Sequence, residues 1–238
     1  MRIHLFGSRL SPFVEKVARA LALKRLEWTL ATVTSPLDFR RWNPQTGKMP
    51  VLDVDGERTY DSTFILRKLD ALAPDPPLLA ADATTAARQR LLEDWSDEAL
   101  YWYGMALRWC DANASATVAQ VLGDMPVPAV LHPIVGVLFR RQIAPQPRAQ
   151  GLGRLPLDAL VRELGMRLDD LVAELGDHPF FFADRPSAAD LAVFGQLAML
   201  RSGPTPQAAE LIDARPPLVA YCARVDAATT ATTTSRAA

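Results

Sequence analysis

The chain has 238 residues, of which 49% are hydrophobic, so it can form one large domain or two small ones with a true core. Its 26 Lys and Arg side chains balance 27 Asp and Glu side chains, which argues against nucleic acid or an anionic membrane as the main partner and leaves room only for a local basic patch. Two cysteines and three histidines are scattered, so we expect no disulfide framework, no CxxC redox site and no metal site.

The sequence offers no targeting or membrane-spanning segment. The N-terminus is too short and too quickly charged to be a signal peptide. The longest apolar stretch, residues 127–139, is interrupted by Pro128 and Pro133 and is shorter than the roughly 20 residues that a spanning helix needs. We therefore expect a cytoplasmic protein.

Residues 1–75 predict a β-α-β-α-β-β-α order. Helical spacing follows Ser11-Pro12, a hydroxyl N-cap and a proline at the first helical position, and Asp55-Gly56 is typical of a two-residue hairpin turn. A mixed four-stranded sheet with helices on both faces is expected from this order. The strands are expected at 2–6, 28–33, 50–54 and 58–60, and the helices at 11–23, at 36–42 and from residue 62.

A second, all-helical domain is expected over residues 85–226, after a proline-rich linker at 76–84. Residues 126–143 predict either a proline-bent helix or a loop and a helix. Residues 227–238 are rich in Ala and Thr and predict a mobile tail. The other helices are expected at 85–107, 157–175, 187–200 and 217–225.

Ser11 allows two interpretations. It can cap the first helix, or its hydroxyl can stabilise a bound thiolate, because a helix N-terminus carries free N–H groups and a partial positive charge. Ser8-x-x-Ser11 stands where a redox protein would carry CxxC. Serines at both positions exclude disulfide exchange, which disfavours a glutathione-dependent reductase.

Two further segments could form a ligand site with Ser11. Pro50 either begins an edge strand or forms a cis bond with Met49 that turns the Met49 backbone toward a peptide ligand. Asp61-Ser62 either begins a helix or binds the amino and carboxylate groups of a ligand.

Together these motifs resemble the thioredoxin-like domain of cytosolic glutathione S-transferases. Ser11-Pro12-Phe13 resembles the catalytic segment of the serine-type classes, and residues 48–52 resemble their Lys-x-cisPro-Val-Leu segment. The resemblance implies that Ser11 activates the glutathione thiol beside Phe13 and that Met49, before Pro50, pairs with the cysteinyl backbone. It also implies that Lys48 binds the glycyl carboxylate and that Asp61 and Ser62 bind the γ-glutamyl end.

A second substrate would lie over Ser11, against the helical domain. Aromatic and Met side chains at helical spacing are more often core than pocket, but the polar edges of Trp, Tyr and Arg suit a half-open apolar cleft. Cys110 adjoins this cluster. The candidate residues for this apolar site are Tyr101, Trp102, Met105, Arg108 and Trp109.

The helical half resembles the same superfamily. Ser187 and Asp190 form an S-x-x-D capping box, for which a structural role is expected. Residues 150–154 and 175–186 are similar to the metaxin and failed-axon-connections branch, which is not known mainly for transferase catalysis.

We therefore expect an α/β thioredoxin-like domain followed by a helical bundle that binds glutathione and conjugates its thiolate to an apolar electrophile. Glutathione is the co-substrate, and no metal is expected. The alternative is a non-catalytic binding or scaffold protein of metaxin type. A homodimer is expected from the resemblance and from the general preference for two-fold symmetry.

Overall fold

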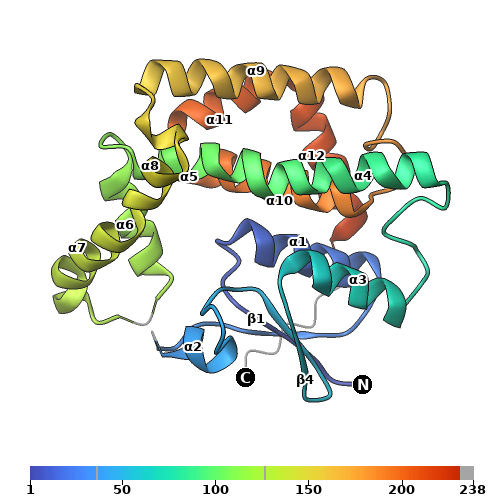
Figure 1. The fold of residues 1–238 in the computed structure, drawn as a ribbon, viewed down its shortest axis with the longest axis horizontal. Helices are drawn as coiled ribbons and strands as arrows, with labels where there is room; N and C mark the ends of the chain where they lie inside the picture. Colours follow the sequence, from blue (N-terminus) through green and yellow to red (C-terminus); the bar gives the residue numbers. More distant parts are fainter. Residues whose placement is uncertain (36, 126, 231–238) are drawn as a thin grey trace.

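The computed structural model describes residues 1–35, 37–125 and 127–230. Its first part has the expected β-α-β-α-β-β-α order, and its second part is helical, which confirms the predicted fold class (Figure 1). The first part contains β1 (Ile3–Phe6), α1 (Pro12–Leu23), β2 (Thr29–Ala31), α2 (Asp38–Trp42), β3 (Val51–Val54), β4 (Glu57–Tyr60) and α3 (Ser62–Leu72).

The second part begins with a long helical segment, which is divided into α4 (Ala83–Trp95), a π-helical turn (Ser96–Leu100) and α5 (Tyr101–Trp109). None of the helices in the described ranges combines the length and apolar character needed to cross a bilayer. The remaining helices are α6 (Ala114–Gly123), α7 (His132–Ile143), α8 (Pro145–Gln150), α9 (Leu157–Leu175), α10 (Ala188–Ser202), α11 (Pro206–Asp213) and α12 (Pro216–Thr229).

The four strands form one mixed sheet in the order β2-β1-β3-β4. β1 pairs in parallel with β2 and antiparallel with β3, and β3 pairs antiparallel with β4. Apolar residues of α1 and α3 cover one face, where Leu5 and Leu52 meet Val17 and Ile65 in one core cluster. α2 covers the other face through Trp42, whose ring centroid lies 5.0 Å from that of Phe6.

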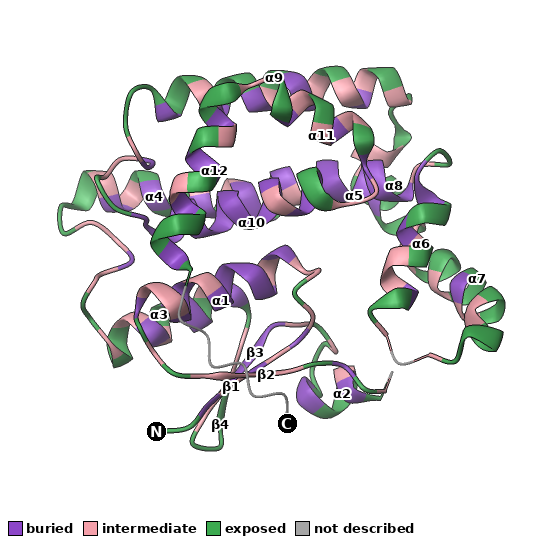
Figure 2. Ribbon diagram, turned by 180° about the vertical axis from the view of Figure 1, so that it is seen from behind, coloured by how far each residue is buried: buried purple, intermediate pink, exposed green. Residues whose placement is uncertain are grey.

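α10 is the central helix of the second part and lies against α1 (Figure 1). It is buried on nearly every turn, whereas α7 is largely exposed (Figure 2). The predicted capping box is present at its N-terminus, where the Ser187 backbone N–H donates to Asp190 Oδ2 at 2.8 Å. Asp190 also accepts from the backbone N–H of Phe181 at 2.9 Å and from the Tyr221 hydroxyl at 3.1 Å. One carboxylate thus joins three segments of the helical core.

Several helical elements differ from the expected ones. The segment expected at 85–107 contains a π-helical turn, and the stretch around 126–143 forms a short 3-10 turn followed by α7. α6, α8 and α11 are additional, and they are short, so that few apolar positions mark each of them in the sequence. Pro36 and Pro126, at the starts of two expected helices, lie outside the described residues.

The last helix continues past the expected end at residue 225. α12 runs to Thr229, whose hydroxyl accepts a hydrogen bond from Arg19 Nη1 on α1 at 3.1 Å. Arg19 also forms an ion pair with Asp226. Polar contacts with a distant helix therefore extend α12 into the stretch that composition alone assigns to the tail. Residues 231–238 of that expected tail lie outside the described residues.

Candidate functional site

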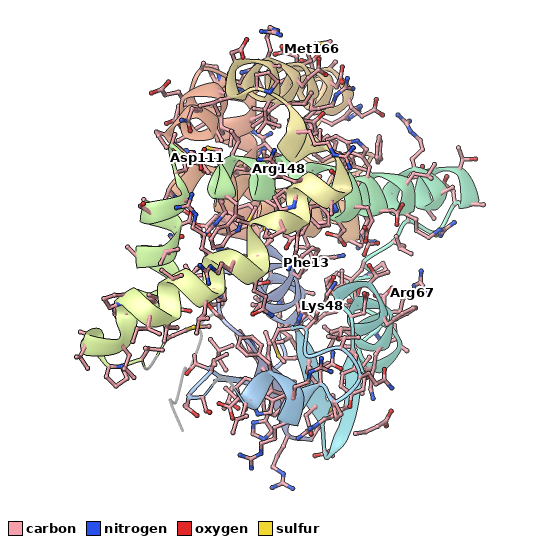
Figure 3. All side chains as sticks on the ribbon, turned by 60° about the vertical axis from the view of Figure 1, so that its left-hand side comes forward. Phe13, Lys48, Arg67, Asp111, Arg148 and Met166 are labelled. Carbon is pink, nitrogen blue, oxygen red and sulfur yellow. The ribbon has the colours of Figure 1, made fainter. Side chains whose placement is uncertain are left out.

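The sheet brings the three predicted motifs to one end. Phe6, the last residue of β1, pairs with Val51, the first residue of β3, and Val51 also pairs with Tyr60, the last residue of β4. The chain therefore leaves β1 toward Ser11, enters β3 from Pro50 and leaves β4 toward Asp61, all at the same end of the sheet. Figure 3 looks onto this side of the molecule, where Phe13 and Lys48 are labelled.

Ser11 is the N-cap residue of α1, with an extended backbone (φ −83°, ψ 124°) and no hydrogen bond from its side chain to the helix. It is half-buried, and Pro12 follows at the first helical position. Ser8 differs, because its hydroxyl donates to a carboxylate oxygen of Asp124 and accepts from the Leu10 N–H at 3.1 Å. The Ser8 hydroxyl is thus used in contacts within the protein, whereas the Ser11 hydroxyl makes no hydrogen bond to the helix that it precedes.

The Met49–Pro50 bond is cis, and the loop before it is held by a residue that the sequence motif does not include. The Asn43 side chain is buried and donates to the Lys48 carbonyl at 2.9 Å and to Thr46 Oγ1 at 2.8 Å. The Thr46 N–H donates back to Asn43 Oδ1 at 3.1 Å. Asn43 fixes the backbone at Lys48, whose own side chain is exposed. Its position at the end of α2 before Pro44 is the only sequence signal of this role.

Asp61 and Ser62 form the turn from β4 into α3. Asp61 has a positive φ of 72°, which is uncommon for a residue other than glycine. Its carboxylate accepts the Thr63 N–H at 2.9 Å and caps α3, while the residue itself stays exposed. Ser62 is buried at the first position of the helix. A carboxylate next to free helix amides can receive both the ammonium and the carboxylate of an amino acid.

A buried charge cluster lies behind these residues. Lys16 on α1 is fully buried, and its Nζ lies 2.7 Å from Glu93 Oε1 and 2.6 Å from Asp97 Oδ2. Burial alone would lower the pKa of Lys16, but the two carboxylates outweigh it and raise that pKa. The pKa of Asp97 is raised to about 6, chiefly by burial and also by the charges of Glu93 and Asp61, against the lowering effect of Lys16. The cluster therefore joins α1 to the helical part close to Asp61.

The π-helical turn and the residue after it contact α1 at two places. It contains Asp97, which faces Lys16, and it is followed by Tyr101, whose ring lies 4.9 Å from that of Phe13. Trp102 lies against Tyr101 at 5.3 Å. Both residues are half-buried, so they form an aromatic wall beside the N-terminus of α1. Burial raises the pKa of Tyr101 above its ordinary value of 10.0, and its protonated phenol can donate a hydrogen bond.

The other residues expected to bind an apolar substrate are buried and face different surroundings. Arg108 lines a cavity of about 210 Å³ together with Pro12 and donates to Gln120 Oε1 at 2.5 Å. Trp109 and half-buried Cys110 line a separate cavity of about 300 Å³, none of whose lining residues comes from the sheet part. Met105 is buried in the helical part. The structure thus brings Tyr101 and Trp102 next to Phe13, and it places the remaining members deeper or farther along α5.

Two family models match the chain. The glutathione S-transferase N-terminal domain matches residues 5–77, and the glutathione S-transferase C-terminal domain matches residues 166–225, so that together they span more than half of the chain. Curated relatives include human metaxin-2, 25% identical over 122 residues that make up 50% of this chain and 46% of metaxin-2. The chain spans about half the length of this relative.

A protein of Aplysia californica described as a probable glutathione transferase is 30% identical over 86 residues, which are 35% of this chain and 92% of that relative. Among solved structures, the β-etherase LigF from Sphingobium sp. strain SYK-6 has a TM-score of 0.67 at 23% identity, over 95% of this chain and 96% of that chain. The structure of rice GST1 in complex with glutathione has a TM-score of 0.66 at 24% identity, over 94% of this chain and 86% of that chain. Identities this low show the fold, and the family models and the Aplysia relative show the family. The chain belongs to the glutathione S-transferase superfamily and has a metaxin-like relationship within it.

Proposed function

We propose that the protein binds glutathione and transfers its thiolate to an apolar electrophile. The observation that carries this proposal is the Ser11 hydroxyl, which lies at the N-terminus of α1 and makes no capping hydrogen bond to that helix. It lies at the end of the sheet that also holds Lys48-Met49-Pro50 and Asp61-Ser62. Family membership and the glutathione bound to the rice structure support the same ligand.

Each part of glutathione has a candidate partner at this end. The Met49 backbone would pair with the cysteinyl residue, Lys48 would bind the glycyl carboxylate, and Asp61 with Ser62 would bind the γ-glutamyl end. Ser11 would then donate its hydroxyl hydrogen to the thiolate. A thiol has a pKa of about 8.5 in water, and a hydroxyl and helix amides lower it by stabilising the charged form.

The electrophile would lie against the aromatic wall formed by Phe13, Tyr101 and Trp102. Rings with polar edges suit a cleft that is apolar inside and open to water at its rim. The thiolate attacks the electrophilic carbon, a carbon–sulfur bond forms, and the leaving group departs with the electron pair of the bond that breaks. The protein contributes orientation and thiolate stabilisation.

Conjugation of glutathione to 1-chloro-2,4-dinitrobenzene tests this proposal. We expect Ser11→Ala to lower kcat/KM roughly hundredfold, the typical effect of removing one donor from a developing or bound anion. The pH profile should also move toward the pKa of a free thiol, because the charged form loses its donor. Ser8→Ala is the matched control, and we expect nearly full activity because its hydroxyl already bonds Asp124. Equal activity of Ser11→Ala and the wild type would reject Ser11 as the activating group.

The metaxin-2 match favours a second candidate, a non-catalytic protein that keeps this fold to bind another ligand or a partner. Titration calorimetry with glutathione separates the two. The transferase proposal expects measurable heat and a higher unfolding temperature at millimolar glutathione, since a ligand that binds only the folded state stabilises it. The absence of both would favour the scaffold.

We also propose that the protein is a homodimer. Phe64 on α3 and Leu91 on α4 are 57% and 71% exposed. Thr63 Oγ1 on α3 donates to Glu93 Oε1 on α4 at 3.0 Å, so the helix segments that carry Phe64 and Leu91 adjoin each other. Exposed apolar side chains on adjacent helices are typical of an interface. Light scattering should give a dimer for the wild type and a monomer for Phe64→Glu with Leu91→Glu. A monomeric wild type would contradict the proposal.

A further inference from the structure

The surface of α7 carries apolar side chains that no described residue covers. Val130 and Leu131, in the turn before α7, and Ile134, Val137 and Leu138, on the helix, are 43–82% exposed. These five residues are called the α7 surface below. α6 and α7 extend away from the central helices of the second part (Figure 1), and α7 is mostly exposed in Figure 2.

The α7 surface is one face of an amphipathic helix. Its residues follow the spacing i, i+1, i+4, i+7 and i+8, which puts them on one side of a helix. The opposite side packs inward, since Gly136 is buried against Val118 of α6 and the Phe139 ring lies 5.8 Å from that of Trp109. One face of α7 therefore packs against neighbouring helices, and its second, apolar face points outward.

The charge around this surface is one-sided. No acidic residue occurs between Asp124 and Asp158, whereas Arg140, Arg141, Arg148 and Arg154 lie in this stretch. Arg140 donates to Asp111 Oδ1 at 3.0 Å, and Arg141 and Arg148 are exposed. Figure 3 shows Arg148 on α8, which directly follows α7. This local excess contrasts with the near balance of the whole chain, which has 26 basic and 27 acidic side chains.

We propose that the α7 surface docks onto an anionic phospholipid bilayer. A helix with an exposed apolar face and flanking arginines can lie in the plane of a membrane interface, with its apolar side chains among the acyl chains and its arginines at the phosphates. A second copy fits less well, because a two-fold interface through this face would place the same arginines opposite one another. The proposal is independent of glutathione binding, because it uses none of the residues at the sheet end.

Cosedimentation of the full chain with vesicles tests the docking. We expect binding to vesicles of phosphatidylcholine with phosphatidylglycerol and little binding to phosphatidylcholine alone. Ile134→Ser with Val137→Ser and Leu138→Ser should lower partitioning at least about tenfold, because buried apolar area drives interfacial binding. Arg141→Gln should lower it about fivefold, since one basic residue near the surface contributes about 1 kcal/mol.

A matched pair of variants distinguishes binding through the α7 surface from nonspecific binding through any exposed apolar side chain. Leu138 on α7 and Met166 on α9 are 59% and 52% exposed, so Leu138→Ser should weaken vesicle binding while Met166→Ser leaves it unchanged. Unchanged unfolding temperatures would show that the variants remain folded. Three results would overturn the proposal: no vesicle binding, equal binding to neutral and anionic vesicles, or loss of self-association rather than vesicle binding in the triple variant.

Discussion

Two helices that pack against each other begin with a serine, and their N-termini are built differently. Ser187 of α10 takes part in a capping box with Asp190, and all of these groups are buried. Ser11 of α1 makes no hydrogen bond from its side chain to its helix and is half-buried. The N-terminus of α10 is thus capped by side chains of the helix itself, whereas the Ser11 hydroxyl at the N-terminus of α1 is not used as a cap.

The difference suggests that α1 is held in place along its length rather than at its start. Lys16 bonds two carboxylates of the helical part, and Arg19 bonds Asp226 and Thr229 of α12. α10 instead is anchored by Asp190, which binds Ser187 and Tyr221. The groups that hold α1 in place thus lie away from Ser11, the residue of the proposed ligand site, whereas the groups that anchor α10 lie at its start.

The largest expected effect comes from removing the anchor of α1. Lys16→Met should lower the free energy of unfolding by about 3–5 kcal/mol, because Glu93 and Asp97 would be left buried without a counter-ion. Denaturant unfolding measures this change. Lys68→Met is the control, because Lys68 pairs with exposed Glu57 and should cost less than about 1 kcal/mol. Equal effects of both variants would mean that α1 is not held by this cluster.

The same anchor should depend on pH. Because the folded-state pKa of Asp97 is about 6, above its ordinary value of 3.8, the folded state binds this proton more tightly than the unfolded state. Asp97 therefore lowers the unfolding free energy as pH rises from about 4 to 6, by about 2–3 kcal/mol at most.

Asp97→Asn removes this titration. The difference in unfolding free energy between the wild type and Asp97→Asn should therefore decline across this pH range and level off above it. Urea titrations at several pH values measure the difference, which cancels the titration of the other carboxylates. A difference that is constant from pH 4 to 7 would contradict a raised pKa at Asp97.

The same substitution at the two N-termini gives the smallest but most direct test. Ser187→Ala should lower the unfolding free energy by about 1–2 kcal/mol, the usual cost of losing an N-cap. Ser11→Ala should cost less than about 0.5 kcal/mol, because no cap bond is lost and such substitutions fall within the range of surface changes. Thermal or denaturant unfolding of both variants suffices. A larger loss at Ser11 than at Ser187 would reverse the comparison.

Local patterns predicted much of this molecule. The strand and helix order of the first part follows from alternation, from the Asp55-Gly56 turn and from helix-start residues, all of which act over a few positions. The capping box at Ser187 is equally local and is present as predicted. The sheet register then places Ser11, Pro50 and Asp61 at one end, as the combined motifs require.

The features that the sequence did not predict depend on contacts between residues that are far apart in the chain. Lys16 meets Asp97 across 81 positions, and no local pattern marks that pair. Asn43 supports Lys48 through side-chain bonds to a loop backbone, which polar residues in many loops could equally form. The π-helical turn at Ser96–Leu100 has no distinct periodicity. The exposed face of α7 has the same spacing as a buried one, so only the structure distinguishes them.

The packing of α10 against α1 bears on how the protein folds. A Cβ on Gly195 would come within 2.6 Å of the Pro12 carbonyl oxygen, and Ala188 and Leu191 of α10 belong to the same core cluster as Leu5 and Val17. The residues that complete the core of the sheet part are therefore synthesised more than a hundred positions after it. The N-terminal family match ends at residue 77, although the core of the sheet part includes residues of α10. During synthesis, α1 can pack against the sheet and α3 but lacks its contacts with α10 until α10 has left the ribosome.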